Sequence, residues 1–368
     1  MNKLCHLSSV HPRYDTRIFF KECRSLAAFG YSVSLVVADG KGDESKDGVA
    51  IFDVGAPSGR LRRMLETTRR VLEKAKLLNA DVYHIHDPEL IPIGLKLKRM
   101  GKAVIFDAHE DVPKQILSKP YLNKPAKVVL STAIGAYEKW ACKKVDAVVA
   151  ATPFIRDKFR SMNISSVDVN NYPLLGELSS EAIDWSQKKS QICYVGGIAA
   201  IRGIHEIVTA MQYVKADVRL QIGGSFSEKS VERAVKSSLG WSRVDELGWL
   251  NRAGVAATLK HSIAGLVTLH PTINYMDALP VKMFEYMSAG VPVIASNFPL
   301  WREIIEGNDC GLCVDPLDPR AIAEAIDFLV NSPVRAEQMG RNGQRAVIDR
   351  YNWSVEERKL FELYGGLI

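Results

Sequence analysis

The chain lacks any hydrophobic run long enough to cross a membrane, and it contains little cysteine. No uninterrupted apolar stretch in its 368 residues approaches the about 18–20 residues that a spanning helix needs. The N-terminal segment MNKLCHLSSVHPRYD reaches charged residues too early for a signal peptide. Six scattered cysteines are too few for a disulfide scaffold. We therefore expect a soluble, non-exported protein of the reducing cytoplasm.

One pair of cysteines, Cys310 and Cys313, has the CxxC spacing of redox and zinc sites. Either role needs a second pair of ligands or a thioredoxin-like context, and the sequence provides neither. The surrounding segment CGLCVD has the pattern of a buried strand. We therefore predict two strand residues here and no metal site.

Positive charge is concentrated in the first half of the chain. Residues 1–170 hold 28 Lys and Arg against 19 Asp and Glu, a net of +9, whereas residues 171–368 hold 20 against 23, a net of −3. This asymmetry indicates that one domain meets a polyanion or an anionic surface, and uneven solvated charge is the alternative. We expect no nucleic-acid partner.

Strand-like apolar runs alternate with amphipathic segments along the chain, which is typical of parallel α/β sheets. The length suits two domains of about 150 residues each. Between them lies a polar stretch interrupted by Pro and Gly. We predict an N-terminal domain over 1–170, a linker over 171–190, a C-terminal domain over 191–345 and a final helical segment over 346–368. Doubly wound domains bind ligands at the carboxyl ends of their strands, so a cleft between the two is the expected site.

Residues 270–303 combine a turn-rich loop, a predicted helix over 281–289 and a buried strand. Glu285 lies among apolar residues of this helix and needs a partner where it is buried. The two hydroxyls of a ribose can supply one. Lys282 adds a positive charge near the helix N-terminus, which itself favours an anion. An exposed glutamate on an amphipathic helix is the alternative.

A second motif, CYVGGIAAIRG over 193–203, follows a predicted strand. Gly196 and Gly197 allow backbone N–H groups to approach a phosphate, and Arg202 precedes a helix whose N-terminus favours negative charge. A glycine pair after a strand also forms ordinary tight turns. The motif therefore predicts either a diphosphate site with Arg202 as its cation or a simple turn.

Histidines and acids follow two predicted strands of the first half. They occur in DVYHIHDPEL and FDAHEDVP, as His84, His86, Asp87, Glu89, His109, Glu110 and Asp111. His84 and His86 share one face of their strand. Such a cluster suits a metal site, whereas buried and hydrogen-bonded histidines are the alternative, above all for His84.

The loop after the first predicted strand contains Arg13, Asp15 and Arg17 in the segment SSVHPRYDTRIFFKE. An aspartate flanked by two arginines can bind an acceptor hydroxyl or a pyrophosphate. An internal ion pair that caps the following helix explains the same pattern.

The segment PVKMFEYMSAGVPVIAS, followed by CGLCVDPLDPRAIAEAI, resembles the C-terminal domain of GT-B retaining glycosyltransferases of family 4. The resemblance covers nearly the whole chain, and HPRYDTRIF with FKECRSLA resembles a subset associated with bacterial surface-polysaccharide synthesis. It implies GT-B architecture: two Rossmann-like, doubly wound domains facing across a cleft, with the final helix crossing back to the N-terminal domain.

The resemblance also implies roles for residues at matching positions. Glu285 would hold the donor ribose, and Asp277, in place of the usual glutamate, would contact the donor sugar. The donor diphosphate would lie on Gly196, Gly197, Arg202 and Lys282, with Gly197 standing where the family has arginine. His86 and His109 would be the catalytic-site histidines beside the reacting sugar.

These roles predict a retaining hexosyl- or N-acetylhexosaminyltransferase that uses a UDP-sugar, or secondly a GDP-sugar. The acceptor would be a saccharide linked to a polyprenyl diphosphate, in the synthesis of a cell-surface polysaccharide such as O-antigen or capsule. No cofactor and no essential metal are expected. The alternatives are a non-hydrolysing sugar-nucleotide 2-epimerase, a metal-dependent hydrolase and a catalytically silent GT-B partner subunit.

A basic amphipathic segment over 60–77 suggests contact with the inner face of the cell membrane. Between Arg60 and Lys76, seven Lys and Arg stand against two Glu, a net of +5. Leu61, Leu65 and Leu72 fall near helical spacing, so one stripe is apolar. A surface helix that packs this stripe on its own domain is the alternative.

Overall fold

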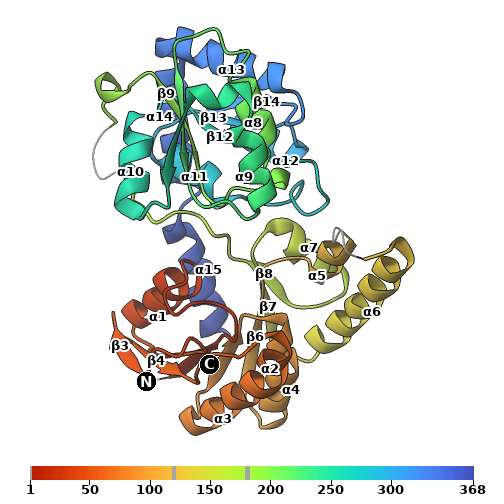
Figure 1. Ribbon diagram of the computed structural model, residues 1–368. Coiled ribbons are helices and arrows are strands. Elements are labelled where there is room, and N and C mark those ends of the chain that lie inside the picture. The colour runs from red at the N-terminus through yellow and green to blue at the C-terminus, as the bar shows by residue number, and fades with distance from the viewer. Residues whose placement is uncertain (1, 118–121, 179–182) are drawn as a thin grey trace. The chain divides into compact units, whose positions relative to one another are not determined.

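The computed structural model describes residues 2–117, 122–178 and 183–368 (Figure 1). The chain divides into two compact units. The first comprises Met1–Asn171 and Trp353–Ile368, and the second comprises Tyr172–Asn352.

The first unit is built on a sheet with strand order β3-β4-β2-β1-β5-β6-β7-β8. Neighbouring strands run parallel except for β3 and β4. The strands are β1 Lys3–Leu7, β2 Ser32–Val37, β3 Glu44–Lys46, β4 Val49–Asp53, β5 Val82–Ile85, β6 Ala103–Ala108, β7 Ala147–Ala150 and β8 Ser166–Asp168. Strands such as β7 are apolar and buried throughout, as expected for a parallel sheet covered on both faces.

Helices connect these strands, and a final helix, α15, ends the chain. They are η1 Ile18–Cys23, α1 Arg24–Phe29, α2 Arg60–Arg62, η2 Arg63–Thr67, α3 Thr68–Leu78, η3 Pro88–Leu90, α4 Ile91–Arg99, α5 Val112–Leu117, α6 Lys124–Cys142, α7 Pro153–Ser161 and α15 Trp353–Gly365. Local sequence sets several ends: Asn123 and Thr152 cap α6 and α7 with their side chains, and Gly30 ends α1 in the left-handed conformation.

The second unit repeats this architecture with strand order β11-β10-β9-β12-β13-β14, and all of these pairs are parallel. Its strands are β9 Gln191–Val195, β10 Arg219–Gly223, β11 Val244–Gly248, β12 Gly265–Val267, β13 Val293–Ser296 and β14 Gly311–Val314. Its helices are η4 Trp185–Gln187, η5 Ala200–Arg202, α8 Ile204–Ala210, α9 Lys229–Lys236, η6 Leu239–Arg243, α10 Arg252–His261, α11 Val281–Ser288, α12 Pro299–Ile305, α13 Pro319–Asn331 and α14 Pro333–Asp349.

Both sheets have the doubly wound topology that the sequence predicts. In each, the chain begins in the middle, winds to one edge and then returns to wind toward the other. The direction reverses between β1 and β5 in the first unit and between β9 and β12 in the second. Sheets of this kind bind ligands at that reversal, outside the carboxyl ends of the strands.

The last helix, α15, belongs to the first unit. Trp353, Leu360 and Tyr364 are buried there, and the Trp353 indole donates to Ser25 Oγ at 2.8 Å. The final segment begins later than the predicted residue 346. Helix α14 continues to Asp349, and the chain stays in the second unit up to Asn352. Most of the predicted 171–190 linker likewise falls in the second unit. No helix in the described ranges is long and apolar enough to span a bilayer.

Candidate active site

The glycine motif of the second unit lies at the reversal of its sheet. Gly196 and Gly197 directly follow β9, and the backbone of Gly196 has φ +127°. Gly203 packs so closely on the end of β12 that an added Cβ would come within 2.0 Å of the Thr268 carbonyl oxygen. This close approach of two loops explains why glycine is needed where the chain enters α8. Arg202 bridges the turn by donating from Nη1 to the Gly197 carbonyl at 3.1 Å.

Lys282 supplies a buried cation beside this turn. Its Nζ has no hydrogen-bond partner within the described part of the chain and lies 3.6 Å from the ring centroid of Tyr194. A Cβ added at Gly196 would be 3.8 Å from the same Nζ, so the ammonium group lies against the glycine turn. Burial, with a smaller contribution from the charge of Arg202, lowers the pKa of Lys282 to about 7. An unpaired buried ammonium next to a glycine turn is suited to bind an anion.

Glu285 lies one helical turn further along α11. Its Oε1 accepts a hydrogen bond from Arg252 Nη1 at 2.7 Å, and Arg252 Nε donates to Glu177 Oε1 at 2.7 Å. The carboxylate is therefore held in place by an arginine from α10. Sequence reasoning missed Arg252 and Glu177, because neither belongs to a motif and both are distant from Glu285 along the chain.

Asp277 is half-buried in the loop that leads from β12 to α11. The Trp301 indole of α12 fixes this loop by donating to the Ala278 carbonyl oxygen at 2.7 Å. The structure thus brings Gly196, Gly197, Arg202, Lys282, Glu285 and the Asp277 loop to the same end of the second sheet.

In the first unit, polar side chains gather at the reversal between β1 and β5. Asp107, at the end of β6, accepts hydrogen bonds on Oδ2 from His86 Nδ1 at 3.1 Å and from His109 Nε2 at 2.8 Å. Arg17 donates to both of its oxygens, at 2.8 and 2.9 Å. Burial alone would raise the pKa of Asp107, but Arg17 and His109 overcome this and hold the pKa well below its usual range.

The ionised Asp107 fixes the protons of a hydrogen-bonded chain that runs into the core. His86 must donate from Nδ1 to Asp107, so its Nε2 accepts from His6 Nδ1 at 2.9 Å. His6 Nε2 then accepts from the Tyr364 hydroxyl at 3.2 Å, and that oxygen accepts from His84 Nδ1 at 2.9 Å. Burial lowers the pKa of His6 and of His84 well below the usual value, so both rings are neutral.

This hydrogen-bonded chain corrects the expectation that His86 lies beside the reacting sugar. Its ring is 1% exposed and both of its nitrogens are engaged, so it cannot contact a sugar directly. His109 differs, because its side chain is 22% exposed and donation from Nε2 to Asp107 leaves Nδ1 as an acceptor. Of the two predicted histidines, only His109 has the exposure that a substrate contact requires.

His11 is a further partly exposed histidine that the sequence analysis did not single out. Its ring lies 5.0 Å from that of His109, and its two nitrogens are 3.5 Å from Asp15 and 3.4 Å from Asp87. Burial lowers the pKa of His11, but the hydrogen bond to Asp15 and the charge of Asp87 raise it by more. Its position in the loop after the first strand, two residues before Arg13, could have indicated a site residue.

The first-loop residues follow the internal ion-pair alternative. Arg13 is buried and donates to both oxygens of Asp39, to Glu44 and to the Gly42 carbonyl. Arg17 is buried against Asp107, and Asp15 accepts from the backbone N–H groups of Arg17 and Ile18 at the start of η1. Arg13 and Arg17 are therefore buried and paired with internal carboxylates, which corrects the expectation that they bind an acceptor.

Comparisons with known proteins show the family of the chain. The family described as "Glycosyltransferase Family 4" matches residues 17–170, and the family described as "Glycosyl transferases group 1" matches residues 177–346. The chain is a GT-B glycosyltransferase of family 4. This confirms the family and fold that the sequence motifs predict.

Relatives of this glycosyltransferase act on different substrates. Phosphatidyl-myo-inositol mannosyltransferase of Mycobacterium leprae is 23% identical over 77% of this chain and 73% of its own length. D-rhamnosyltransferase WbpZ of Pseudomonas aeruginosa is 26% identical over 72% of this chain and 68% of its own length. The structure of Anabaena HepE in complex with UDP-glucose matches with a TM-score of 0.75 at 12% identity, covering 99% of both chains.

The other predicted sites of the glycosyltransferase are occupied by internal contacts. Asp87 accepts from the Ser8 and Ser9 hydroxyls and lies beside His11, and Glu89 is paired with Arg63 at 2.9 Å. Two groups of potential metal ligands lie within the described residues, His6–Glu22–His84–His86 and His86–Asp107–His109. In both groups the His86 nitrogens are hydrogen-bonded to His6 and Asp107. Burial raises the pKa of Cys310 and of Cys313 to about 12, as suits unreactive thiols in and beside β14.

Proposed function

We propose that this glycosyltransferase transfers a hexosyl or N-acetylhexosaminyl group from a UDP-sugar, with a GDP-sugar as second choice, to a lipid-linked saccharide. The observation that carries the donor assignment is the buried, unpaired ammonium group of Lys282 beside the Gly196–Gly197 turn. Arg202 adds a second cation, and Glu285 offers a fixed carboxylate to the ribose hydroxyls. HepE, which shares the fold, is solved with UDP-glucose.

In the proposed reaction the bond between the anomeric carbon and the β-phosphate oxygen breaks, and a bond to an acceptor oxygen forms on the same face. The acceptor hydroxyl gives its proton to the departing phosphate oxygen, so the anomeric configuration is retained. Lys282, Arg202 and the backbone N–H group of Gly197 stabilise the charge that develops on the diphosphate. Because these groups carry the charge, we propose that no metal ion and no cofactor is essential.

We assign the acceptor to the first unit. His109 Nδ1 would accept a hydrogen bond from an acceptor hydroxyl, and His86 would hold His109 indirectly through Asp107. A lipid-linked acceptor is supported by the mannosyltransferase relative, which is named for a phosphatidyl-inositol substrate. A role in surface-polysaccharide synthesis is supported by a relative named for capsular polysaccharide biosynthesis in Staphylococcus aureus, which covers 47% of this chain.

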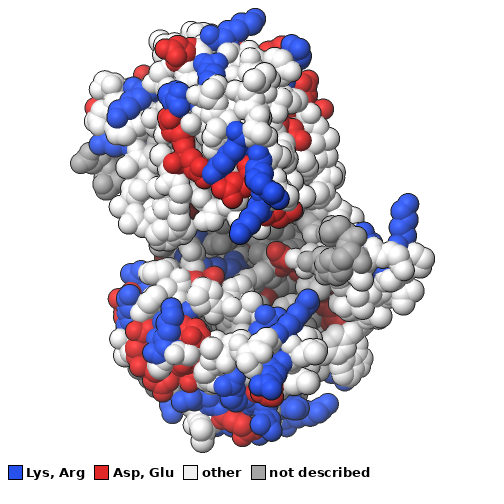
Figure 2. Space-filling model, in the orientation of Figure 1, with Lys and Arg blue, Asp and Glu red and all other residues white. Residues whose placement is uncertain are grey.

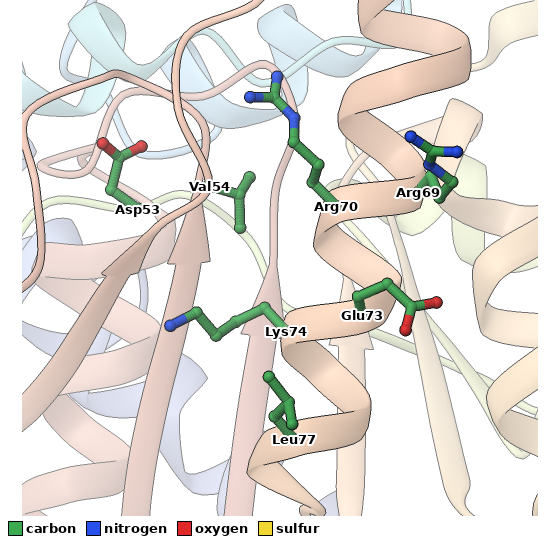
Figure 3. Close-up of a pocket in the computed structure, with 7 residues that line it drawn as sticks. All are labelled: Asp53, Val54, Arg69, Arg70, Glu73, Lys74 and Leu77. Atoms are coloured by element: carbon green, nitrogen blue, oxygen red, sulfur yellow. The ribbon is translucent and has the colours of Figure 1, made fainter.

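The basic segment over 60–77 divides its charges between solvent and internal contacts. Lys74 lies 4.6 Å from the Phe52 ring centroid, and Arg70 donates to Thr67. Arg69, Arg70, Glu73 and Lys74 of α3 line a cavity of about 630 Å³ together with Asp53 and Val54, at the end of β4. Figure 3 shows these side chains. By contrast, Leu61 and Leu65 are 76% and 73% exposed. Peripheral membrane binding of this unit at the inner face of the cell membrane therefore remains part of the proposal.

The test is to incubate the whole protein with UDP-glucose, UDP-galactose, UDP-N-acetylglucosamine and GDP-mannose. Each is supplied with a polyprenyl-diphosphate-linked N-acetylglucosamine, with and without EDTA. We expect EDTA-insensitive transfer from a UDP-sugar, with the product retaining the α configuration by NMR. Epimerised donor would indicate a sugar-nucleotide 2-epimerase, and EDTA-sensitive hydrolysis would indicate a metal-dependent hydrolase. Absence of any turnover would favour a silent partner subunit.

A further inference from the structure

Helix α6 presents an apolar stripe to solvent. Val129, Ala133, Ala136 and Trp140 follow each other at spacings of four, three and four residues, so they share one helix face. All four are exposed, Val129 at 69% and Trp140 at 47%. Exposed apolar residues on a surface helix are common singly, but a continuous stripe of this length usually marks a binding surface.

The opposite face of α6 attaches the helix to its domain. Only Glu138, Ala141 and Cys142 are buried among its residues, and the helix packs along α5. Glu138 forms an ion pair with Lys158 at 2.5 Å. In Figure 1 the helix extends away from the sheet of the first unit, and in Figure 2 the visible surface over it is largely uncharged. The apolar stripe is thus not needed for packing within the first unit.

The charges around this stripe have one sign. Between residues 122 and 144 the chain has five lysines and one acid, and that acid is the buried Glu138. The lysines are Lys124, Lys127, Lys139, Lys143 and Lys144. Two aromatic rings lie beside these lysines. The ring centroids of Tyr137 and Trp140 are 5.9 Å apart, and Lys144 Nζ lies 3.8 Å from the Trp140 ring centroid.

We propose that α6 is a lipid-interface helix that binds the surface of an anionic bilayer. Apolar residues enter the boundary between headgroups and acyl chains, Trp and Tyr rings favour that depth, and flanking lysines reach anionic headgroups. A second copy of this chain fits less well, since two such helices would bring lysines against lysines. The inference extends the proposed function, because it gives a surface by which the enzyme reaches a lipid-linked acceptor.

The experiment is flotation of the whole protein with vesicles of phosphatidylcholine alone and of phosphatidylcholine mixed with phosphatidylglycerol, at low and high salt. We expect binding to the anionic vesicles at low salt and release at high salt. The double variant Val129→Ser with Trp140→Ser should lower the partition coefficient by at least about tenfold. The matched control, Leu61→Ser with Leu65→Ser, removes two exposed apolar residues from α2 and η2 and should lower it less.

Binding of UDP, measured by calorimetry on each variant, checks that the second unit is folded and separates the two claims. Vesicle binding without UDP binding would contradict the proposed donor site but not the role of α6. Equal partitioning of the α6 variant and the parent protein would overturn the lipid-interface proposal, as would a larger loss in the α2 control. Failure of the parent protein to bind anionic vesicles, with α6-dependent self-association in sedimentation velocity, would assign the stripe to a protein contact instead.

Discussion

Lys282 and Arg202 place two positive charges beside one glycine turn before any ligand is bound. The Lys282 ammonium group is buried and Arg202 donates to the Gly197 carbonyl, so both side chains are held beside the turn without a ligand. Burial and, to a smaller extent, the charge of Arg202 destabilise the protonated form of Lys282. They lower its pKa to about 7. A bound diphosphate would pair with the protonated form of Lys282 and raise its pKa again.

Donor binding should therefore take up a proton at Lys282. Binding raises the pKa of Lys282 above its value of about 7 in the free protein, so UDP affinity is fully developed below pH 7. Affinity should fall as pH rises above 7, by up to about tenfold per pH unit until the pKa of the complex is reached. Titration calorimetry with UDP between pH 6 and 9 measures this, and Lys282→Met is the control that should remove the slope. A slope unchanged in Lys282→Met would contradict the assignment.

Glu285→Ala should weaken UDP binding about a hundredfold. Two charge-assisted hydrogen bonds to a ribose contribute roughly 3 kcal/mol. Because Glu285 also pairs with Arg252, the matched control is Glu177→Ala, which breaks the other bond of that arginine and leaves Glu285 in place. The control should retain affinity within about threefold of the parent. Equal losses in both variants would mean that Arg252, and not Glu285, carries the effect.

Arg202→Ala should lower turnover more than donor binding. The guanidinium lies beside the glycine turn, and its charge matters most when the diphosphate departs. We expect kcat to fall by about a hundredfold and the Kd for UDP to rise by less than tenfold. Steady-state kinetics and calorimetry on the same variant separate the two. A loss confined to Kd would show that Arg202 binds the ground state only.

At the scale of elements, the C-terminal helix α15 takes part in the polar core of the first unit. The Tyr364 hydroxyl links His6 and His84, and through His6 it connects to His86 and Asp107. No motif in the sequence indicated this contact, because His6 and His86 are 80 residues apart and Tyr364 lies 280 residues beyond His84.

Tyr364→Phe should destabilise the first unit by about 1–3 kcal/mol, since it leaves the buried His84 Nδ1–H without an acceptor. Tyr31→Phe is the matched control, because the Tyr31 hydroxyl makes no hydrogen bond among the described residues, and it should change stability by less than about 0.5 kcal/mol. Urea unfolding followed by circular dichroism measures both. Equal stability of the two variants would show that the hydrogen-bonded chain contributes nothing to folding.

Features set by local sequence were predictable, whereas features set by contacts between distant elements were not. Strand and helix alternation predicted both sheets, because buried parallel strands require unbroken apolar runs. The clustering of Gly196, Arg202, Lys282 and Glu285 in the second unit was predictable, since these residues lie in two local motifs. The site of the first unit was not, because whether His86 faces solvent or core depends on β1 and α15. Arg13 and Arg17 likewise look the same in sequence whether they bind a ligand or, as here, Asp39 and Asp107.

At the scale of the whole molecule, two doubly wound units each carry a polar site at the reversal of their sheet. Formal charge is also uneven along the chain, with a net of +9 over residues 1–170 and −3 over the remainder. The account assigns the nucleotide to the second unit and the acceptor and the lipid surface to the first. These assignments predict that the two sites respond to different ligands.

The central claim is that the second unit binds the donor nucleotide between the glycine turn and α11. Hydrogen exchange of the whole protein, measured by mass spectrometry with and without UDP, tests it most directly. The account predicts slower exchange on UDP binding in two segments, residues 194–204 and 268–286, with no change around His109. Protection confined to the first unit, or UDP binding that leaves both segments unprotected, would contradict it.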